Sequence, residues 1–266
     1  MRLIILILFS LPLFAAERIV TLSPAIAEIT ADLGALDEIV AVSEYTYYPK
    51  ALQQRPKIGG YFSLSLEKII AMRPTLVIGL PHQRETLEKL ETFRIRTLQV
   101  ELGKIKEIES AITAIAQTLN RQADAQKLLG EIELSRTSAP KLEKSKNVLI
   151  VFGNASGIDK GVYVAGHDLY FEEILHLCGA ENAYREDFNA QPLLKAEGLI
   201  ATDPDTVLLL FGPLDRFDAD AVMRSWRQLP LKAVRNNSIR IIQSDYLLIP
   251  SHRVAKSIQT ICEAIR

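Results

Sequence analysis

The chain has 266 residues, and its 31 lysines and arginines against 32 aspartates and glutamates give a formal net charge of −1. This balance does not fit a nucleic-acid-binding protein, which usually carries a basic surface. A composition of 48% hydrophobic and 24% charged residues excludes bulk disorder, and the length allows one large domain or two smaller ones. Two cysteines are too few for a disulfide scaffold or a four-cysteine zinc site.

The first 16 residues have the pattern of a secretory signal peptide. Arg2 supplies a positive charge, residues 3–14 form a largely apolar run, and Ala15 and Ala16 suit a cleavage site. This run is shorter than the roughly 20 residues that a membrane-spanning helix needs. We therefore expect export to the periplasm, and no later stretch of the sequence predicts a membrane span.

Short runs rich in valine, isoleucine and leucine alternate with helical patterns in the rest of the chain. They lie at residues 18–23, 38–43, 75–80, 96–102, 147–153, 205–212 and 238–244. Such strands, when separated by helices, are typical of parallel sheets that helices cover on both faces. Because the runs fall into two groups, we predict an α/β fold with two Rossmann-like lobes and mostly parallel sheets.

A purely helical stretch separates the two groups of strands. Apolar residues between 105 and 119 recur at steps of three and four, which is one stripe along a helix. A second amphipathic helix follows and ends before Pro140. We expect a stiff connecting helix at 121–139, between an N-terminal lobe at 17–120 and a C-terminal lobe at 140–266.

Two segments repeat one pattern, which supports a pair of related lobes. Residues 67–78 and 197–208 each begin with a glutamate, continue through an apolar helical turn to a proline, and then enter a strand. Pro74 and Pro204 end these helices because proline cannot continue a helix.

Glu67 and Glu197 occupy equivalent places in this repeat. One interpretation is helix stabilisation, because Ser65 is a predicted N-cap and an acidic residue in the first turn is favoured by the helix dipole. The other is a matched pair of carboxylates, one on each lobe, that meets a two-fold symmetric partner. Such a partner offers the same patch twice.

The loops beyond the carboxyl ends of the strands are the expected ligand-binding edge of open α/β sheets. Facing lobes would bring these loops to one cleft, namely residues 23–24, 44–48, 80–83, 152–156, 212–216 and 245–249. Tyr45, Tyr47 and Tyr48 lie in one of these loops and Tyr61 in the next part of the chain. Such rings suit a large, flat or amphipathic ligand, although some of them could only cover the core of the lobe.

The sequence contains no catalytic motif that we recognise. GNASG at 153–157 is not the GxSxG nucleophile elbow, and there is neither a GxxxxGK[ST] loop nor a GxGxxG motif. The histidines at 82, 167, 176 and 252 show no HxH or HExxH spacing, so we predict no resident metal. We expect no enzymatic activity, and a hydrolase whose triad is hidden in the sequence is the remote alternative.

Cys178 and Cys262 both lie in apolar helical patterns. An oxidising compartment allows them to form a disulfide. Two buried free thiols are the alternative, because cysteine is often buried without a partner.

The stretch from RIVTLSPAIAEITADLGA through SEYTYYP to KIGGYFSLSLEKIIAMRPTLVI resembles the N-terminal lobe of the helical-backbone periplasmic binding proteins. The similarity continues through ILHLCGAENAY, AEGLIATDPDTVLLL and QSDY, so it covers nearly all of the mature chain. SEYTYYP and the cysteines in LCG and IC are most similar to the cobalamin-binding members. The rest of the pattern is shared with iron-siderophore and haem binders.

This resemblance implies two α/β lobes joined by a single long rigid helix, with the ligand in the cleft between them. It implies that the protein captures a corrinoid such as cobalamin, has no cofactor of its own, and docks onto an ABC permease dimer in the inner membrane. The free protein is expected to be a monomer.

The resemblance also implies roles for individual residues. Tyr45 matches a corrinoid-contacting tyrosine, Tyr61 stands where the family has a cleft tryptophan, and Asp245 matches a ligand-contacting aspartate. Tyr246 and Phe152, from the predicted cleft loops, complete the expected ligand-binding set.

The same comparison gives the repeated carboxylates and the cysteines a role. Glu67 and Glu197 match the two carboxylates that pair with arginines of the permease. Cys178 and Cys262 match a disulfide of the family.

Three positions depart from the family pattern. Leu80 replaces a cleft tryptophan, a second tryptophan position lies near Gln191, and Ile249 replaces a ligand-contacting arginine. The pocket is therefore expected to be less aromatic, and haem or a ferric siderophore is the alternative ligand. Anionic siderophores favour cationic residues in the cleft. The candidates for that role are Arg84, Arg216 and Arg253.

Overall fold

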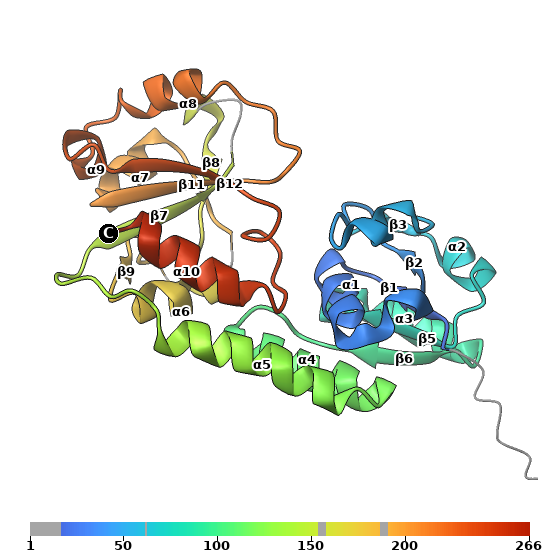
Figure 1. Ribbon diagram of the computed structural model, residues 1–266. Helices are drawn as coiled ribbons and strands as arrows, with labels where there is room; N and C mark the ends of the chain where they lie inside the picture. Colours follow the sequence, from blue (N-terminus) through green and yellow to red (C-terminus); the bar gives the residue numbers. More distant parts are fainter. Residues whose placement is uncertain (1–16, 62, 154–157, 187–190) are drawn as a thin grey trace, which may run out of the picture.

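The computed structural model describes residues 17–61, 63–153, 158–186 and 191–266. The predicted signal peptide at residues 1–16 lies outside the described residues. The described chain forms two α/β domains, which confirms the predicted fold class (Figure 1). Within these ranges, no helix has both the length and the apolar character that a membrane span requires.

The N-terminal domain is built on a four-stranded parallel sheet in the order β2-β1-β5-β6. These strands are β1 (Ile19–Thr21), β2 (Ile39–Val42), β5 (Leu76–Gly79) and β6 (Arg96–Gln99). Every residue of β1 and β5 is buried, as expected for central strands that helices cover on both faces. The short strands β3 (Gly59–Gly60) and β4 (Ser63–Leu64) pair antiparallel beside the sheet.

Helices and helical turns of the N-terminal domain connect these strands. They are α1 (Pro24–Thr30), η1 (Ala31–Ala35), η2 (Leu36–Glu38), η3 (Lys50–Gln54), α2 (Leu66–Ala71), η4 (Pro81–Gln83) and α3 (Arg84–Thr92). Ser65 caps α2 by accepting the backbone N–H of Lys68, which confirms the predicted N-cap.

The C-terminal domain contains a second four-stranded parallel sheet, in the order β12-β11-β7-β9. Its strands are β7 (Asn147–Phe152), β9 (Glu181–Asn182), β11 (Thr206–Phe211) and β12 (Ile239–Gln243). The short strands β8 (Val162–Tyr163) and β10 (Leu193–Leu194) pair antiparallel. The helices are η5 (Ile158–Lys160), α6 (Tyr170–Leu177), α7 (Ala196–Thr202), α8 (Ala219–Trp226), α9 (Lys232–Arg235) and α10 (Val254–Ala264).

The two sheets have the same topology. Taken along the chain, each sheet places its second strand at one edge, followed by the first, third and fourth strands. A short strand also precedes the helix before the third strand in both domains, as β4 and α2 lead to β5, and β10 and α7 lead to β11. The short sequence repeat around Glu67 and Glu197 is therefore part of a repeat of the whole domain.

Helices α4 (Ile105–Leu119) and α5 (Gln122–Thr137) pack against each other and pass along both domains (Figure 1). Their bounds agree closely with the two predicted helices. The backbone N–H of Ile105, the first residue of α4, donates to Glu173 in the C-terminal domain, and α4 also packs against α1 of the N-terminal domain. In addition to the expected connecting helix, α4 thus also bridges the domains.

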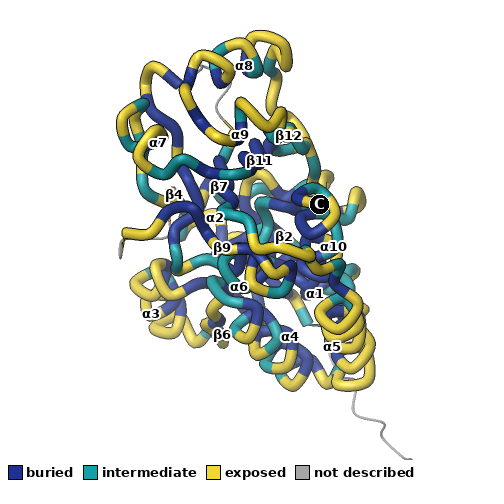
Figure 2. The backbone as a smooth tube through the Cα atoms, turned by 90° about the vertical axis from the view of Figure 1, so that its left-hand side faces the viewer, coloured by how far each residue is buried: buried dark blue, intermediate teal, exposed yellow. Residues whose placement is uncertain are grey.

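The predicted pairing of Cys178 with Cys262 is present as a disulfide. It joins the end of α6 to α10, and both cysteines are fully buried in the largest hydrophobic cluster. Figure 2 shows the strands β7 and β11 buried inside this domain, while α5 exposes much of its surface. The bridge therefore holds the last helix of the chain against the C-terminal core.

Candidate functional site

A cavity of ≈ 1110 Å³ lies between the two domains. Its wall consists of residues from both halves of the chain, and most of them are apolar or aromatic. Pockets for small molecules usually enclose about 300–1,000 Å³. This cavity is large enough for a ligand at or above the upper end of that range.

Of the predicted ligand-binding residues, Tyr45, Tyr61 and Phe152 line this cavity. The side chains of Tyr45 and Tyr61 are 65% and 40% exposed, so both leave ring surface open to a ligand. The ring of Tyr61 lies 4.4 Å from that of His82, and the ring of Phe152 lies 5.7 Å from that of Phe171. The structure thus brings aromatic residues of both domains to one site.

The loop after β2 fixes the position of Tyr45. The backbone N–H of Glu44 donates to the carbonyl of Gly59 at 2.9 Å, and the buried Thr46 hydroxyl donates to the carbonyl of Ser43 at 2.9 Å. Between these anchors, Tyr45 adopts a φ of 63°, which is unusual for a residue with a Cβ atom. Such strain persists only where the surroundings impose it, and it often marks a functional position.

Asp245 and Tyr246 do not line the cavity. Nη1 of Arg253 donates to the Asp245 carboxylate at 2.9 Å, and the Tyr246 hydroxyl lies 2.9 Å from that of Thr260. The structure therefore does not bring these two side chains together with the other predicted ligand-binding residues. The end of the same loop, Leu248 to Pro250, does reach the cavity.

Of the other positions predicted to lie in the cleft, some line the cavity and some do not. Leu80, Gln191 and Ile249, the three positions that depart from the family pattern, all line the cavity. The loop at 212–216, which lies within the described chain, contributes no lining residue. Instead, the backbone N–H of Gly212 donates to the Asp215 carboxylate within the loop, and the side-chain amide of Gln243 donates to the carbonyl of Gly212.

Several lining residues escaped the sequence reasoning. Glu101 and Leu102 lie just beyond the end of β6 at Gln99, but the predicted apolar run at 96–102 included them in the strand, so they were not assigned to a cleft loop. Tyr170 and Phe171 begin α6, and no signal in the sequence points to them. Their rings stack at 4.3 Å, and the Tyr170 hydroxyl donates to the carbonyl of Leu247.

A buried ion pair joins the two domains beside the cavity. Nε and Nη2 of Arg253, just before α10, both donate to the Glu28 carboxylate on α1, and each side chain is 3% exposed. The Ser251 hydroxyl donates to the same carboxylate at 2.6 Å. Burial raises the pKa of the Glu28 carboxyl, while hydrogen bonding and the charge of Arg253 oppose that rise.

A second pair lies next to it. Nε2 of His252 is 2.8 Å from the Asp32 carboxylate in η1, and the Tyr48 hydroxyl donates to the same carboxylate at 3.4 Å. Burial acts to raise the pKa of Asp32, but the hydrogen bond and charge of His252 outweigh it, so this pKa is lowered. Together these contacts hold α1 and η1 of the N-terminal domain against the segment before α10.

Glu67 and Glu197 do not line the cavity and lie in the first turns of α2 and α7. Both residues are exposed, one on each domain. Neither carboxylate forms an ion pair with another residue of the described chain. Both are therefore available to a partner.

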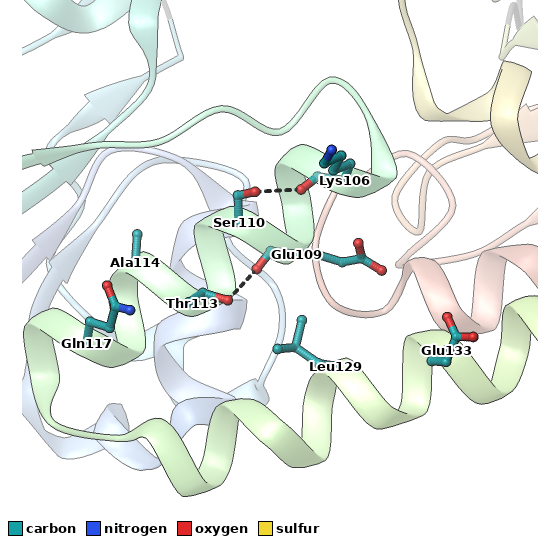
Figure 3. Close-up of a pocket in the computed structure, with 8 residues that line it drawn as sticks. All are labelled: Lys106, Glu109, Ser110, Thr113, Ala114, Gln117, Leu129 and Glu133. Atoms are coloured by element: carbon teal, nitrogen blue, oxygen red, sulfur yellow. Dashed lines mark hydrogen bonds between the residues drawn. The ribbon is translucent and has the colours of Figure 1, made fainter.

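A smaller groove of ≈ 530 Å³ runs between α4 and α5 (Figure 3). Within it, the hydroxyls of Ser110 and Thr113 donate to the carbonyls of Lys106 and Glu109 in their own helix. Polar groups satisfied in this way offer little to a ligand, so the inter-domain cavity is the candidate site. No group of histidine, cysteine or acidic residues in the described part of the chain has an arrangement that would hold a metal ion.

A family profile described as "Periplasmic binding protein" matches residues 19–246. The chain belongs to this family. Its members are substrate-binding transport proteins of the periplasm, which agrees with the expected class of function and with the expected location.

The similar proteins are themselves named for two different ligands. The chain is 27% identical over 250 residues to a vitamin B12-binding protein of Vibrio campbellii, covering 93% of this chain and 89% of that protein. It resembles the vitamin B12-binding protein BtuF of Vibrio cholerae, with a TM-score of 0.74, 22% identity, and 94% and 96% of the two chains covered. It equally resembles the haem-binding protein RhuT of Roseiflexus sp. RS-1, with a TM-score of 0.77, 24% identity, and 94% and 98% covered. Similarity at this level shows that the fold is shared.

Proposed function

We propose that this periplasmic binding protein captures a corrinoid of the cobalamin type in the inter-domain cavity and delivers it to an ABC importer. The observation that carries the proposal is the cavity itself, which is large and receives Tyr45, Tyr61 and Phe152 from both domains. The sequence similarity to vitamin B12-binding proteins over 93% of the chain supports the same ligand class.

Binding requires no bond chemistry. A corrin is a broad ring whose face can lie against the exposed rings of Tyr45 and Tyr61, since aromatic contacts gain area at low entropic cost. The amides on the rim of the ring can donate hydrogen bonds to polar groups of the wall. The corrinoid is thus cargo, and the protein needs no cofactor of its own.

Delivery would use the two exposed glutamates. Glu67 and Glu197 occupy equivalent turns of domains with the same topology, so they offer one carboxylate to each half of a two-fold permease. Removal of the N-terminal signal peptide would release a monomer into the periplasm, where it meets the permease.

Haem is the second candidate ligand, because solved haem-binding proteins share the fold as closely as the B12-binding one does. Tyrosine and histidine are residue types that ligate haem iron. Tyr45, Tyr61 and His82 of the cavity lining belong to these types.

Calorimetric titration of the mature protein with cyanocobalamin, haem and a ferric siderophore separates these ligands. We expect saturable binding of cyanocobalamin with a stoichiometry of about one per chain, because the cavity between the domains is of a size to hold one such ligand. Absence of heat with cyanocobalamin, together with tight binding of haem or the siderophore, would overturn the corrinoid assignment.

A further inference from the structure

The inter-domain cavity carries charge of one sign. Among the described residues that line it, the acidic ones are Glu44, Glu101 and Glu107, and none is a lysine or an arginine. The short internal stretches outside the described residues contain no lysine or arginine in their sequence either. The described part of the wall therefore offers three carboxylates and no lysine or arginine.

His82, the one histidine among the described lining residues, does not offset these carboxylates at neutral pH. Burial lowers the pKa of His82 from its ordinary 6.5, because the imidazolium form loses hydration in the wall of the cavity. At pH 7 the ring is accordingly neutral.

Arg253, the closest of the predicted cleft cations to the domain interface, is held by other groups. Its guanidinium donates to the carboxylates of Glu28 and Asp245, and also to the carbonyl of Asp245 at 2.7 Å. The ring of Tyr48 covers it at 4.1 Å. With its side chain only 3% exposed, Arg253 has no free face for a ligand carboxylate.

The other nearby cations also turn away from the cavity. Lys104 follows a lining residue, but its Nζ donates to the carbonyl of His167 at 2.9 Å and pairs with Asp168 at 3.3 Å. Arg84 and Arg216 are exposed and line no part of the cavity. The cationic residues that an anionic ligand would need are thus absent from the described wall.

The three glutamates are placed to accept hydrogen bonds. The Glu107 carboxylate accepts the backbone N–H of Lys104 at 3.0 Å, which fixes it at the start of α4. Glu44 and Glu101 are exposed, each two residues beyond the end of its strand, β2 or β6. An ionised carboxylate has about four acceptor positions and no donor, so it recognises N–H groups and repels another carboxylate.

We propose that the cavity selects its ligand by charge, accepting a ring whose rim carries amides or a net positive charge and rejecting one whose rim carries carboxylates. The inference rests on the proposed function and narrows it. The substrate class becomes the fully amidated corrinoids, and rings that bear free acid groups are excluded, whether corrinoid or porphyrin.

A matched pair of ligands tests this selection. Dicyanocobinamide carries amides on its corrin rim, whereas dicyanocobyrinic acid carries carboxylates on the same ring. Calorimetry should show that the wild-type protein binds the amide form at least ~10-fold more tightly, the factor expected from one poorly screened charge repulsion. The triple variant Glu44→Gln/Glu101→Gln/Glu107→Gln should narrow that ratio, chiefly by improving binding of the acid.

Control variants separate local charge from net charge. Glu131→Gln/Glu143→Gln/Glu263→Gln removes as much charge from exposed positions outside the cavity lining and should leave the ratio unchanged. Glutamine at 107 can still accept the N–H of Lys104, so the start of α4 is retained. Circular dichroism of each variant checks that it is folded.

The outcomes are distinct. Equal binding of both corrinoids would overturn charge selection and leave the corrinoid function standing. If the cavity variant and the control variant narrow the affinity ratio between the two corrinoids equally, the three glutamates of the cavity are not the source of the selection. Failure of both corrinoids to bind, with or without binding of haem, would overturn the proposed function and the charge selection together.

Discussion

Replacing Arg253 by methionine should cost the protein a large part of its stability. The side chain lies at the domain interface, where it donates two hydrogen bonds to Glu28 and further ones to Asp245. Methionine keeps much of the volume but leaves the carboxylate of Glu28, whose side chain is 3% exposed, without its cation. Breaking a buried ion pair by removing one partner typically costs about 3–5 kcal/mol, because the remaining charge is buried and uncompensated.

Two further variants separate the lost charge from the lost packing. Glu28→Leu/Arg253→Met removes both charges, and apolar replacement of a whole buried pair is often nearly neutral, so it should recover most of the loss. Arg121→Met removes a half-exposed partner of Glu38 and should cost about 1 kcal/mol or less.

Urea denaturation provides the assay. Fluorescence of Trp226, the single tryptophan and a buried residue of the C-terminal domain, follows that domain, while circular dichroism follows the whole chain. A loss below about 1 kcal/mol for Arg253→Met would refute the reasoning, because the buried carboxylate would then have found another partner or water. A double variant as unstable as the single one would equally refute it.

Three other predictions concern the disulfide, the acid limb of stability and the permease. Cys178→Ala/Cys262→Ala should lower the free energy of unfolding by up to about 4.6 kcal/mol, the chain-entropy value for a sequence separation of 84, as measured in urea. Asp32 has a pKa below its ordinary 3.8, so the unfolded chain takes up the proton first as pH falls. Its contribution is therefore present at pH 7 and lost as pH falls through 3.8 and below, so the stability advantage of wild type over Asp32→Asn, measured in urea, should shrink in that window. Glu67→Arg/Glu197→Arg should abolish corrinoid uptake by cells and leave corrinoid affinity unchanged.

Each of these predictions has a control. In reductant, the wild-type protein should have the same free energy of unfolding as the double cysteine variant. If that variant is as stable as the oxidised wild type, the predicted contribution of the disulfide is wrong. An Asp32→Asn curve parallel to that of wild type at every pH would contradict the acid prediction. Glu88→Arg/Glu263→Arg, which changes one exposed glutamate on each domain, should transport normally. If Glu67→Arg/Glu197→Arg loses its affinity for the corrinoid, Glu67 and Glu197 do not belong to a docking surface.

The sequence predicted best the elements in which the apolar residues of the local pattern are also the residues that the fold buries. Each predicted apolar run contains a strand of the parallel sheets, and the stripe at 105–119 is α4. The pairs β3–β4 and β8–β10 were missed because two-residue strands have no periodicity to read. Their pairing depends on the helices and loops that bring them together.

The site was predictable only where it follows a strand. Tyr45 and Phe152 lie at strand ends and line the cavity, as the general rule for α/β sheets expects. Asp245 also follows a strand, yet Arg253 engages its carboxylate, and Arg253 is in turn positioned by Glu28 from the other domain. A contact between residues more than two hundred positions apart leaves no local signal, so the sequence could not exclude Asp245 from the wall.

Competition for the cavity tests the central claim most directly. The mature protein would be dialysed against equal concentrations of cyanocobalamin and haem, and the ligand retained by each chain would be identified from its absorption spectrum. The account predicts that the protein retains the corrinoid, because its described wall combines exposed aromatic rings with carboxylates and lacks lysine and arginine. Retention of haem in preference to cyanocobalamin would contradict it.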